Sequence, residues 1–326
     1  MKKDLFIDIG STNIKWKKDG IVQQTSFPAP VVNSNGRFEV DAEEIFGIIE
    51  PLIDGAERVF LSVQMHGYVL LKGGKRVSNY ISWRDERGAN SVPMFELTKE
   101  YGVDIKPNLP RLSLQTQTVT YDEFCTLGSY LVYRLTGKNQ THISDAAPSG
   151  FYNVCTREQE KTSFRLPEAV YSLQPVRSYK NALIYTPIGD QQSSVLGAVG
   201  KDFDGYVLNL GTAAQLCKIS KGFVRGEFES RPYFEGKTLC TITRLIGGGV
   251  IAQHTDDELF DALVKEYGNA MKKLPICDRL LATGGLIKYR KPLLCKVLDA
   301  LKVNYSFNED CDALAGLEIL SKGELK

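Results

Sequence analysis

Short apolar runs alternate along this chain with longer segments of helical periodicity, and glycines or polar residues separate them. The apolar runs predict β-strands at residues 5–9, 14–17, 21–23, 58–63, 69–71, 80–83, 182–185, 206–210, 214–219, 238–243 and 279–282. The periodic segments predict helices at residues 41–52, 89–101, 121–135, 191–199 and 293–301, and another from residue 249 onward. Asp41 is the candidate N-cap of the first helix, and Gly137 closes the third. The alternation predicts an α/β fold.

The first predicted strand ends in a turn that is rich in hydrogen-bond donors. Gly10 lets the backbone turn where a Cβ atom would crowd a ligand, and the hydroxyls of Ser11 and Thr12 follow it. Such a concavity binds phosphate oxygens. Asp8 stands at its mouth, where Mg²⁺ on ATP phosphates needs one carboxylate and several waters. Lys15 could pair with Asp8 or reach a phosphate, and an ordinary hairpin with a polar turn is also compatible with these residues.

Two later strands end in turns of the same kind. Asp190 follows Gly189 at a strand-to-helix junction, where it could be a helix N-cap or a general base. Gly211 and Thr212 follow the strand at residues 206–210 and open a second donor-rich turn. A strand, a glycine and a hydroxyl in each half of the chain predict two related lobes that close on one nucleotide. Together the three turns indicate a phosphoryl-transfer site.

Six motifs, in the same order, resemble those of the FGGY carbohydrate kinases, which share the actin, Hsp70 and hexokinase fold. They are Asp8-Ile9-Gly10-Ser11-Thr12 with Lys15, Gln64-Met65-His66-Gly67, Trp83-Arg84-Asp85-Glu86-Arg87, Gly189-Asp190, Gly211-Thr212 and Gly284-Gly285. Residues 189–195, 209–215 and 231–236 are most similar to the sedoheptulokinase branch. The resemblance implies two ribonuclease H-like lobes of the actin and hexokinase type around a central cleft, with a truncated second lobe.

The resemblance also implies a reaction and a role for each motif. The reaction is ATP-dependent phosphorylation of a primary hydroxyl of a ketose or polyol, such as sedoheptulose, xylulose or ribulose. Asp190 would be the general base, and Asp8 would bind Mg²⁺. The residues implied to contact the sugar are Gln64, Met65, His66, Trp83, Asp85 and Arg87. The residues implied to bind ATP are Gly10, Ser11, Thr12, Lys15, Gly211, Thr212, Gly284 and Gly285.

Several of these residues also have a purely structural interpretation. His66 could be a core histidine with satisfied ring nitrogens, and Trp83 could be a core residue. Asp85 and Arg87 could form a surface ion pair that contributes little stability. Gly284 and Gly285 could belong to a plain loop before a helix. Ser144-Asp145-Ala146 resembles a family position too, but the sequence assigns it no role.

The chain departs from the family after Gly249, where it is much shorter than family members. A glycine-glutamate-arginine loop and a following helix beside the nucleotide are missing between Gln253 and Pro275, and a lysine-containing signature is missing near residues 121–127. A degenerate sugar- or phosphosugar-binding protein that has lost ATP binding is therefore an alternative. An Hsp70- or actin-like ATPase that acts on protein partners is a weaker one, since it has no use for a sugar site.

Length and charge narrow the class of protein. A chain of 326 residues with 43% hydrophobic content can bury a sizeable core. We expect two domains, residues 1–204 for the sugar and residues 205–326 for the nucleotide. A net charge of +1, from 40 basic and 39 acidic residues, disfavours nucleic-acid and membrane-surface partners.

Targeting and redox signals agree with a cytoplasmic enzyme. No apolar run approaches the roughly 20 residues of a membrane helix, and we expect no signal peptide. The seven cysteines include no Cys-x-x-Cys pair and indicate reduced thiols. The expected partners are a small-molecule sugar and ATP, and a homodimer is left open.

Overall fold

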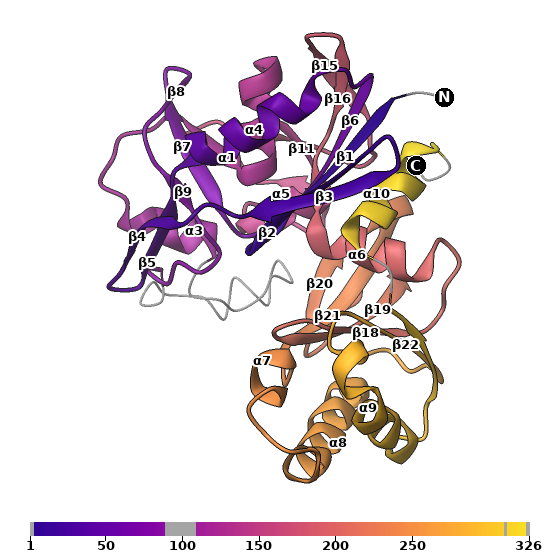
Figure 1. The fold of residues 1–326 in the computed structure, drawn as a ribbon. Helices are drawn as coiled ribbons and strands as arrows, with labels where there is room; N and C mark the ends of the chain where they lie inside the picture. The colour runs from indigo at the N-terminus through magenta and orange to yellow at the C-terminus, as the bar shows by residue number, and fades with distance from the viewer. Residues whose placement is uncertain (1–2, 89–108, 310–311, 324–326) are drawn as a thin grey trace.

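The computed structural model describes residues 3–88, 109–309 and 312–323, which form two lobes (Figure 1). The helix predicted at residues 89–101 lies outside the described residues. The upper lobe in Figure 1 holds the N-terminal strands, and the lower lobe holds the strands from β18 onward. The last helix, α10 (Ala313–Ser321), returns to the upper lobe, where it packs on β1 and β6.

A mixed sheet forms the centre of the upper lobe. Its strand order is β15-β16-β6-β1-β2-β3, and β17 also pairs with β6. These strands are β1 (Asp4–Ile9), β2 (Asn13–Lys18), β3 (Ile21–Ser26), β6 (Arg58–Val63), β15 (Pro175–Tyr179), β16 (Ala182–Tyr185) and β17 (Ile188–Gly189). Asp19 and Gly20 have positive φ angles of 50° and 80°, which suit a tight β2–β3 hairpin. The two linked hairpins at the start of the chain are therefore confirmed.

Alternate residues of β1 face opposite layers of this lobe. Leu5, Ile7 and Ile9 pack in one core with α1 (Ala42–Ile49) and α4 (Leu127–Thr136). Phe6 points the other way, into a second core with α6 (Asp190–Val199) and α10. The period-two alternation of the strand thus buries both faces of the sheet.

A second, antiparallel sheet lies beside the first in the upper lobe. Its order is β10-β7-β9-β5-β4, and β8 pairs with β7. Its strands are β4 (Pro30–Ser34), β5 (Arg37–Val40), β7 (Tyr68–Lys72), β8 (Lys75–Arg76), β9 (Tyr80–Ile81) and β10 (Glu123–Thr126). Two small pairs are β11 (Gln140–His142) with β14 (Glu168–Val170) and β12 (Tyr152–Asn153) with β13 (Glu158–Gln159). Short helical segments are α3 (Pro110–Ser113), α5 (Ile143–Ala146), η1 (Glu50–Ile53), η2 (Leu114–Thr116) and η3 (Ala147–Ser149).

The lower lobe is a sheet with helices on both faces. Its order is β20-β21-β19-β18-β22-β23, with bounds β18 (Tyr206–Leu210), β19 (Ala214–Lys221), β20 (Glu229–Pro232), β21 (Lys237–Leu245), β22 (Arg279–Thr283) and β23 (Asn304–Asn308). One face packs on α8 (Asp256–Lys273) and α9 (Ile287–Ala300). The other face shares a core with α6, α10 and Phe60 of the first sheet. Helices α6 and α10 therefore lie between the two lobes. Short segments are η4 (Phe234–Gly236) and α7 (Gly248–Ile251).

Three predicted elements differ from the structure. Residues 80–83 form only the two-residue strand β9, and Trp83 lies in the turn that follows. The helix predicted from residue 121 begins at Leu127, because residues 123–126 pair with β7 and Thr126 caps the helix by accepting from Ser129 N at 3.0 Å. Gly137, at φ 72°, ends that helix as predicted. The helix predicted from residue 249 onward is divided into the short α7 and the 18-residue α8, and α8 occupies the segment in which the sequence showed no counterpart of the family's helix.

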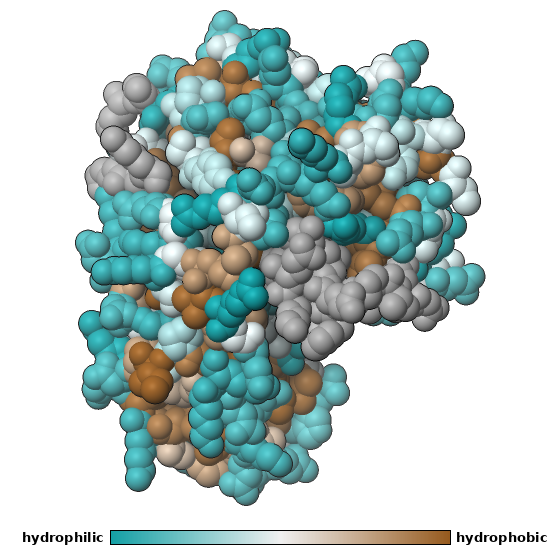
Figure 2. Space-filling view, turned by 180° about the vertical axis from the view of Figure 1, so that it is seen from behind, coloured by the Kyte–Doolittle hydropathy of each residue, from teal (hydrophilic) through white to brown (hydrophobic). Residues whose placement is uncertain are grey.

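Over the described residues, the surface and the cysteines show no feature that points to a particular function. Figure 2 shows a mainly hydrophilic face with small scattered hydrophobic patches. Six cysteines in the described ranges are free thiols. Among the helices of the described ranges, none combines the length and apolar character that crossing a bilayer requires.

Candidate active site

Three parallel strands bring the first acidic turn and the mid-chain acidic junction together. The register aligns Ile9 of β1 with Val63 of β6, and Val63 with Gly189 of β17. The residues that follow these three at the same sheet edge are Gly10, Gln64 and Asp190. Gln64 Nε2 donates to the Gly10 carbonyl at 3.2 Å, so the ends of β1 and β6 are joined directly.

Asp8 lies among other carboxylates at this edge. Ser62 Oγ donates to Asp8 Oδ1 at 3.0 Å. Burial, followed by the negative charges of Asp190 and Asp312, raises the pKa of Asp8 to about 7, although Ser62 and Lys15 act in the opposite direction. Burial is the largest cause of this shift, and the nearby carboxylates add to it because like charges disfavour ionisation.

Asp145 is a further carboxylate of the site to which the sequence assigned no role. It lies in α5, is 2% exposed, and accepts hydrogen bonds from the hydroxyls of Thr126 and Thr141, the latter at 2.7 Å. Burial, with a further contribution from the charge of Asp190, raises the pKa of Asp145 to about 7. The signal in the sequence was the resemblance of residues 144–146 to a family position.

We expect the substitution Asp145→Asn to be more favourable to stability at pH 8 than at pH 5. The folded pKa of about 7 lies above the ordinary value of 3.8, so the folded protein holds this proton more tightly than the unfolded chain. This stabilisation is complete below about pH 4 and is lost as the pH rises through 7. Between pH 5 and pH 8, the free energy of unfolding of the wild type, relative to the variant, should therefore fall by about 2 to 3 kcal/mol. Urea unfolding measures the difference, and a constant difference would contradict the prediction.

The Gln64-Met65-His66-Gly67 turn lies beside the junction that carries Asp190. A Cβ atom on Gly189 would approach Met65 Sδ to 2.6 Å, so Met65 packs on the backbone just before Asp190. His66 has a positive φ of 64° and is 8% exposed. Gln64 Oε1 is buried and has no hydrogen-bond partner among the described residues, so this edge keeps an acceptor that a ligand hydroxyl or water would satisfy.

Tyr80 closes the same turn from the second sheet. A Cβ atom on Gly67 would lie 2.2 Å from the Tyr80 hydroxyl, so only glycine fits beneath this buried ring. Burial, and then the charges of Asp145 and Asp190, raise the pKa of Tyr80. Tyr80 had no predicted role, because it lies in another sheet and comes near these carboxylates only through tertiary packing.

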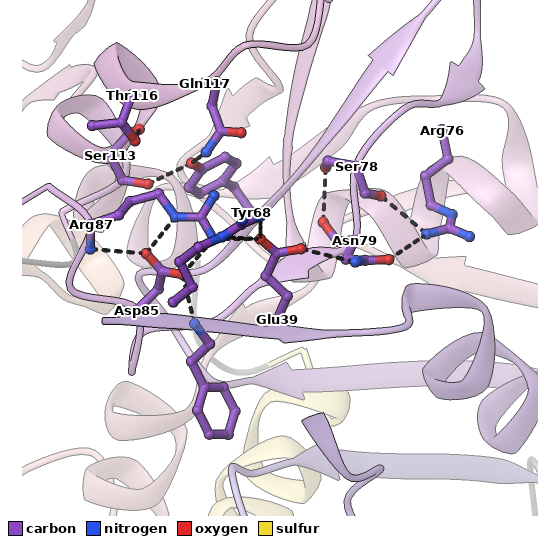
Figure 3. Close-up of polar contacts among 12 residues, drawn as sticks. Glu39, Tyr68, Arg76, Ser78, Asn79, Asp85, Arg87, Ser113, Thr116 and Gln117 are labelled. Carbon is purple, nitrogen blue, oxygen red and sulfur yellow. Dashed lines mark hydrogen bonds and ion pairs between the residues drawn. The ribbon is translucent and has the colours of Figure 1, made fainter. Parts of the chain in front are cut away.

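Asp85 and Arg87 form a buried network with Glu39 (Figure 3). Arg87 Nε and Nη2 donate to the two Asp85 oxygens at 2.7 and 2.6 Å, and Nη2 also donates to Glu39 Oε1 at 2.6 Å. Phe38 N donates to Asp85 Oδ2 at 2.8 Å. Asp85 is 0% exposed, so the interpretation as a surface ion pair is wrong. Trp83 is 38% exposed, so it is not a core residue either.

Glycine-rich loops gather at the carboxyl end of the lower-lobe sheet. The parallel strands β18 and β22 end side by side, which places Gly211-Thr212 next to Gly284-Gly285. Gly284 has φ 108°, and a Cβ atom there would lie 2.6 Å from the Leu210 carbonyl oxygen, so the position requires glycine. The N–H groups of Gly248 and Gly249 donate to the carbonyls of Gly211 and Thr212 at 2.8 and 2.9 Å. The 247–249 loop was not predicted as part of this site.

The first turn leaves its hydroxyls accessible and connects to the C-terminal helix. Thr12 is exposed and Ser11 is partly exposed. Lys15 Nζ lies 3.9 Å from Oδ2 of Asp312, the N-cap of α10. Lys15 therefore pairs with Asp312 rather than with Asp8. The meeting of Thr212 with Asp8 and Asp190 in one cleft stays a prediction.

The residues at Asp8 fit a hydrated Mg²⁺. Asp8 offers carboxylate oxygen, the donor that Mg²⁺ prefers, and the crowding of negative charge around it would be relieved by a cation. In the described part of the chain, no cluster of three or more histidine, cysteine, aspartate or glutamate side chains could hold a metal. One carboxylate with waters and substrate phosphates is the usual Mg²⁺ arrangement in kinases.

Comparisons with known proteins identify the fold. No protein-family profile and no curated protein sequence matches this chain. Ligand-bound xylulose kinase from Lactobacillus acidophilus matches with a TM-score of 0.83 at 16% identity, over 99% of this chain and 89% of that one. Gluconate kinase from the same organism matches with a TM-score of 0.82 at 16% identity, over 98% of this chain and 89% of that one. Plasmodium falciparum glycerol kinase with ADP matches with a TM-score of 0.75 at 14% identity, over 98% of this chain and 89% of that one.

At this level of identity the likeness establishes the architecture. The chain has the two-lobed actin-like α/β fold of these carbohydrate kinases, as predicted. Closeness to the sedoheptulokinase branch and truncation of the second lobe stay predictions.

Proposed function

We propose that the protein transfers the γ-phosphoryl group of ATP to a primary hydroxyl of a ketose or polyol, as an FGGY-type carbohydrate kinase. The observation that supports this most directly is the position of Asp190 at the same strand edge as Asp8. One carboxylate is available to accept a proton there, and another is available for a metal-bound phosphate. The kinase fold supports the same reaction class.

Asp190 is the proposed general base. It accepts the proton of the substrate hydroxyl while the hydroxyl oxygen attacks the γ-phosphorus, and the bond from that phosphorus to the oxygen of ADP breaks. Gln191 N donates to Asp190 Oδ1 at 2.8 Å and holds the carboxylate in one orientation. Mg²⁺ at Asp8 would neutralise charge on the transferring group.

The remaining predicted residues divide between the two substrates. On the ATP side, Gly10, Ser11, Thr12 and Lys15 would face phosphate from the first lobe. Their counterparts in the second lobe would be Gly211, Thr212, Gly284 and Gly285. On the sugar side, Gln64, Met65, His66 and Trp83 would contact hydroxyls and carbon faces. Arg87 would complete the sugar site, and Asp85 would hold it in place. We also propose a domain boundary at residues 204 and 205 and a cytoplasmic location.

The direct test is ATP turnover against a panel of ketoses and polyols in the presence of Mg²⁺. The proposal expects turnover that depends on one or a few of these sugars. ATP hydrolysis that is indifferent to every sugar would instead support an actin-like ATPase. Stabilisation by sugar with no response to Mg²⁺ and ATP would support the degenerate sugar-binding protein.

We expect Mg²⁺ with ATP to raise the melting temperature, and Asp8→Asn to remove most of this rise. At a ligand concentration 100-fold above Kd the stabilisation would be about 2.7 kcal/mol. Because the pKa of Asp8 is about 7 without metal, binding must displace its proton, so the rise should be larger at pH 8 than at pH 6. The asparagine variant should show no such pH dependence. An equal rise in both proteins would place the metal elsewhere.

A further inference from the structure

Side-chain hydrogen bonds join the first turn of α6 to the lower-lobe sheet. Gln192 Nε2 donates to the Pro232 carbonyl at 3.1 Å, and Gln191 Nε2 donates to Thr241 Oγ1 at 3.4 Å. Both bonds end on strands of the lower lobe, β20 and β21. The strand directly before α6 is β17, which pairs with β6 of the upper lobe. The start of α6 is therefore a joint between the lobes, and Asp190 lies on it.

Arg231 of β20 reaches this joint from the lower-lobe sheet. Its Nη1 donates to Gln191 Oε1, and its Nε donates to Glu229 Oε2 at 2.6 Å. Arg231 is 5% exposed and Glu229 is 7% exposed. A buried ion pair of this kind is costly to desolvate, so stability alone is a weak reason for it.

The network is also incompletely satisfied. Among the described residues, Arg231 Nη2 and Glu229 Oε1 are buried without hydrogen-bond partners. Such groups are uncommon in folded proteins, and sites that depart from local packing rules are often functional. The arrangement therefore calls for a role other than packing.

Gln191 connects this network to the proposed base. Its side chain is held by Arg231, and its backbone N–H donates to Asp190 Oδ1 at 2.8 Å. We propose that Arg231 is a positioning residue in the second lobe, which acts through Gln191 to orient the Asp190 carboxylate. This inference rests on the proposed kinase function. The orientation of the Asp190 carboxylate would then depend on the lower lobe, which also carries the Gly211-Thr212 turn.

Two other roles for Arg231 would give different kinetics. If Arg231 touched the sugar directly, its loss would raise KM more than it lowered kcat. If it served stability alone, its loss would lower the melting temperature and leave kcat of the folded protein unchanged. A positioning residue should lower kcat with little effect on KM.

The test is a double-mutant cycle in the ATP-turnover assay with the best sugar. We expect Arg231→Met and Gln191→Met each to lower kcat by about 10- to 100-fold, since a small misplacement of a reacting group has effects of this size. KM should stay within about threefold of the wild type. The double variant should be no slower than the slower single variant, because one residue acts through the other. Losses that multiply, or a wild-type kcat in either folded variant, would overturn the inference.

Two further variants guard against misfolding. Gln191→Glu keeps an acceptor for Arg231 and should recover part of the activity that Gln191→Met loses. If Arg231→Met does not fold, the comparison of Gln191→Glu with Gln191→Met tests the proposal by itself. Equal kcat values for these two variants would refute it. Arg58→Gln is the control, because it removes an arginine ion pair outside this network, the partly buried pair with Asp4 at 2.5 Å. It should lower stability and leave kcat unchanged.

The same assay separates this inference from the function on which it rests. If the wild type turns over no sugar, or if Asp190→Asn keeps full activity, the proposed function is wrong. If the wild type and Asp190→Asn behave as expected while the cycle is additive, only the role of Arg231 is wrong.

Discussion

Replacing Asp190 by asparagine is expected to lower kcat by about 10²- to 10⁴-fold, the usual contribution of a positioned general base. The amide cannot accept the proton of the attacking hydroxyl, but it keeps the size of the side chain and an oxygen that accepts from Gln191 N, which lies 2.8 Å away in the wild type. Binding of the sugar and of ATP should therefore change little. Steady-state ATP consumption measures kcat, and ligand-dependent melting measures binding.

The Asp190 variant also has an electrostatic signature. The negative charge of Asp190 raises the pKa of Asp8 and of Asp145, so its removal should lower both pKa values. The stabilisation by Mg²⁺ with ATP should then develop at a lower pH than in the wild type. As a control, Asp54→Asn removes an exposed carboxylate that pairs with Lys180, and it should keep the wild-type kcat. Full activity in the Asp190 variant would end the assignment of the base.

Replacing Gly316 by alanine is expected to destabilise the whole protein by about 1 to 3 kcal/mol. Helices α10 and α6 contact each other through glycine, and a Cβ atom on Gly316 would lie 2.0 Å from the backbone oxygen of Ser193. Gly197 is similarly close to Asp312, since a Cβ atom there would lie 2.4 Å from its carbonyl oxygen. The alanine would push apart the two helices that lie between the lobes. Thermal unfolding measures the loss, at roughly 2 to 4 °C per kcal/mol for a domain of moderate size.

Gly47→Ala is the matched control for this prediction. Gly47 also lies inside a helix, α1, but a Cβ atom there would meet no other atom within 4 Å. Alanine should therefore stabilise that helix by up to about 1 kcal/mol, the difference in helix propensity. If Gly316→Ala melts at or above the wild-type temperature, the close contact of α6 and α10 does not limit stability.

The site was partly predictable because some of its geometry is local. Asp8 lies near the end of the apolar strand β1, Asp190 directly follows β17, and parallel strands end at a common edge, so the sequence motifs already pointed to one site. The neighbours of these residues in the folded protein were harder to predict from the sequence. Tyr80, in the second sheet, and Asp145, in helix α5, come near Asp190 only through tertiary packing, and their chain positions carry no periodic signal.

The sequence by itself determined the opening hairpins, most later strands and the cap of α1, because turn residues and side-chain alternation act over a few positions. Tertiary structure alone decided that residues 123–126 form a strand, since their partner is β7, some fifty positions earlier. It also decided that Asp85 is enclosed by Arg87 and a backbone amide, and that α10 returns to the first lobe. The physical reason is that pairing register and burial depend on contacts between segments far apart in the chain, which local propensity does not encode.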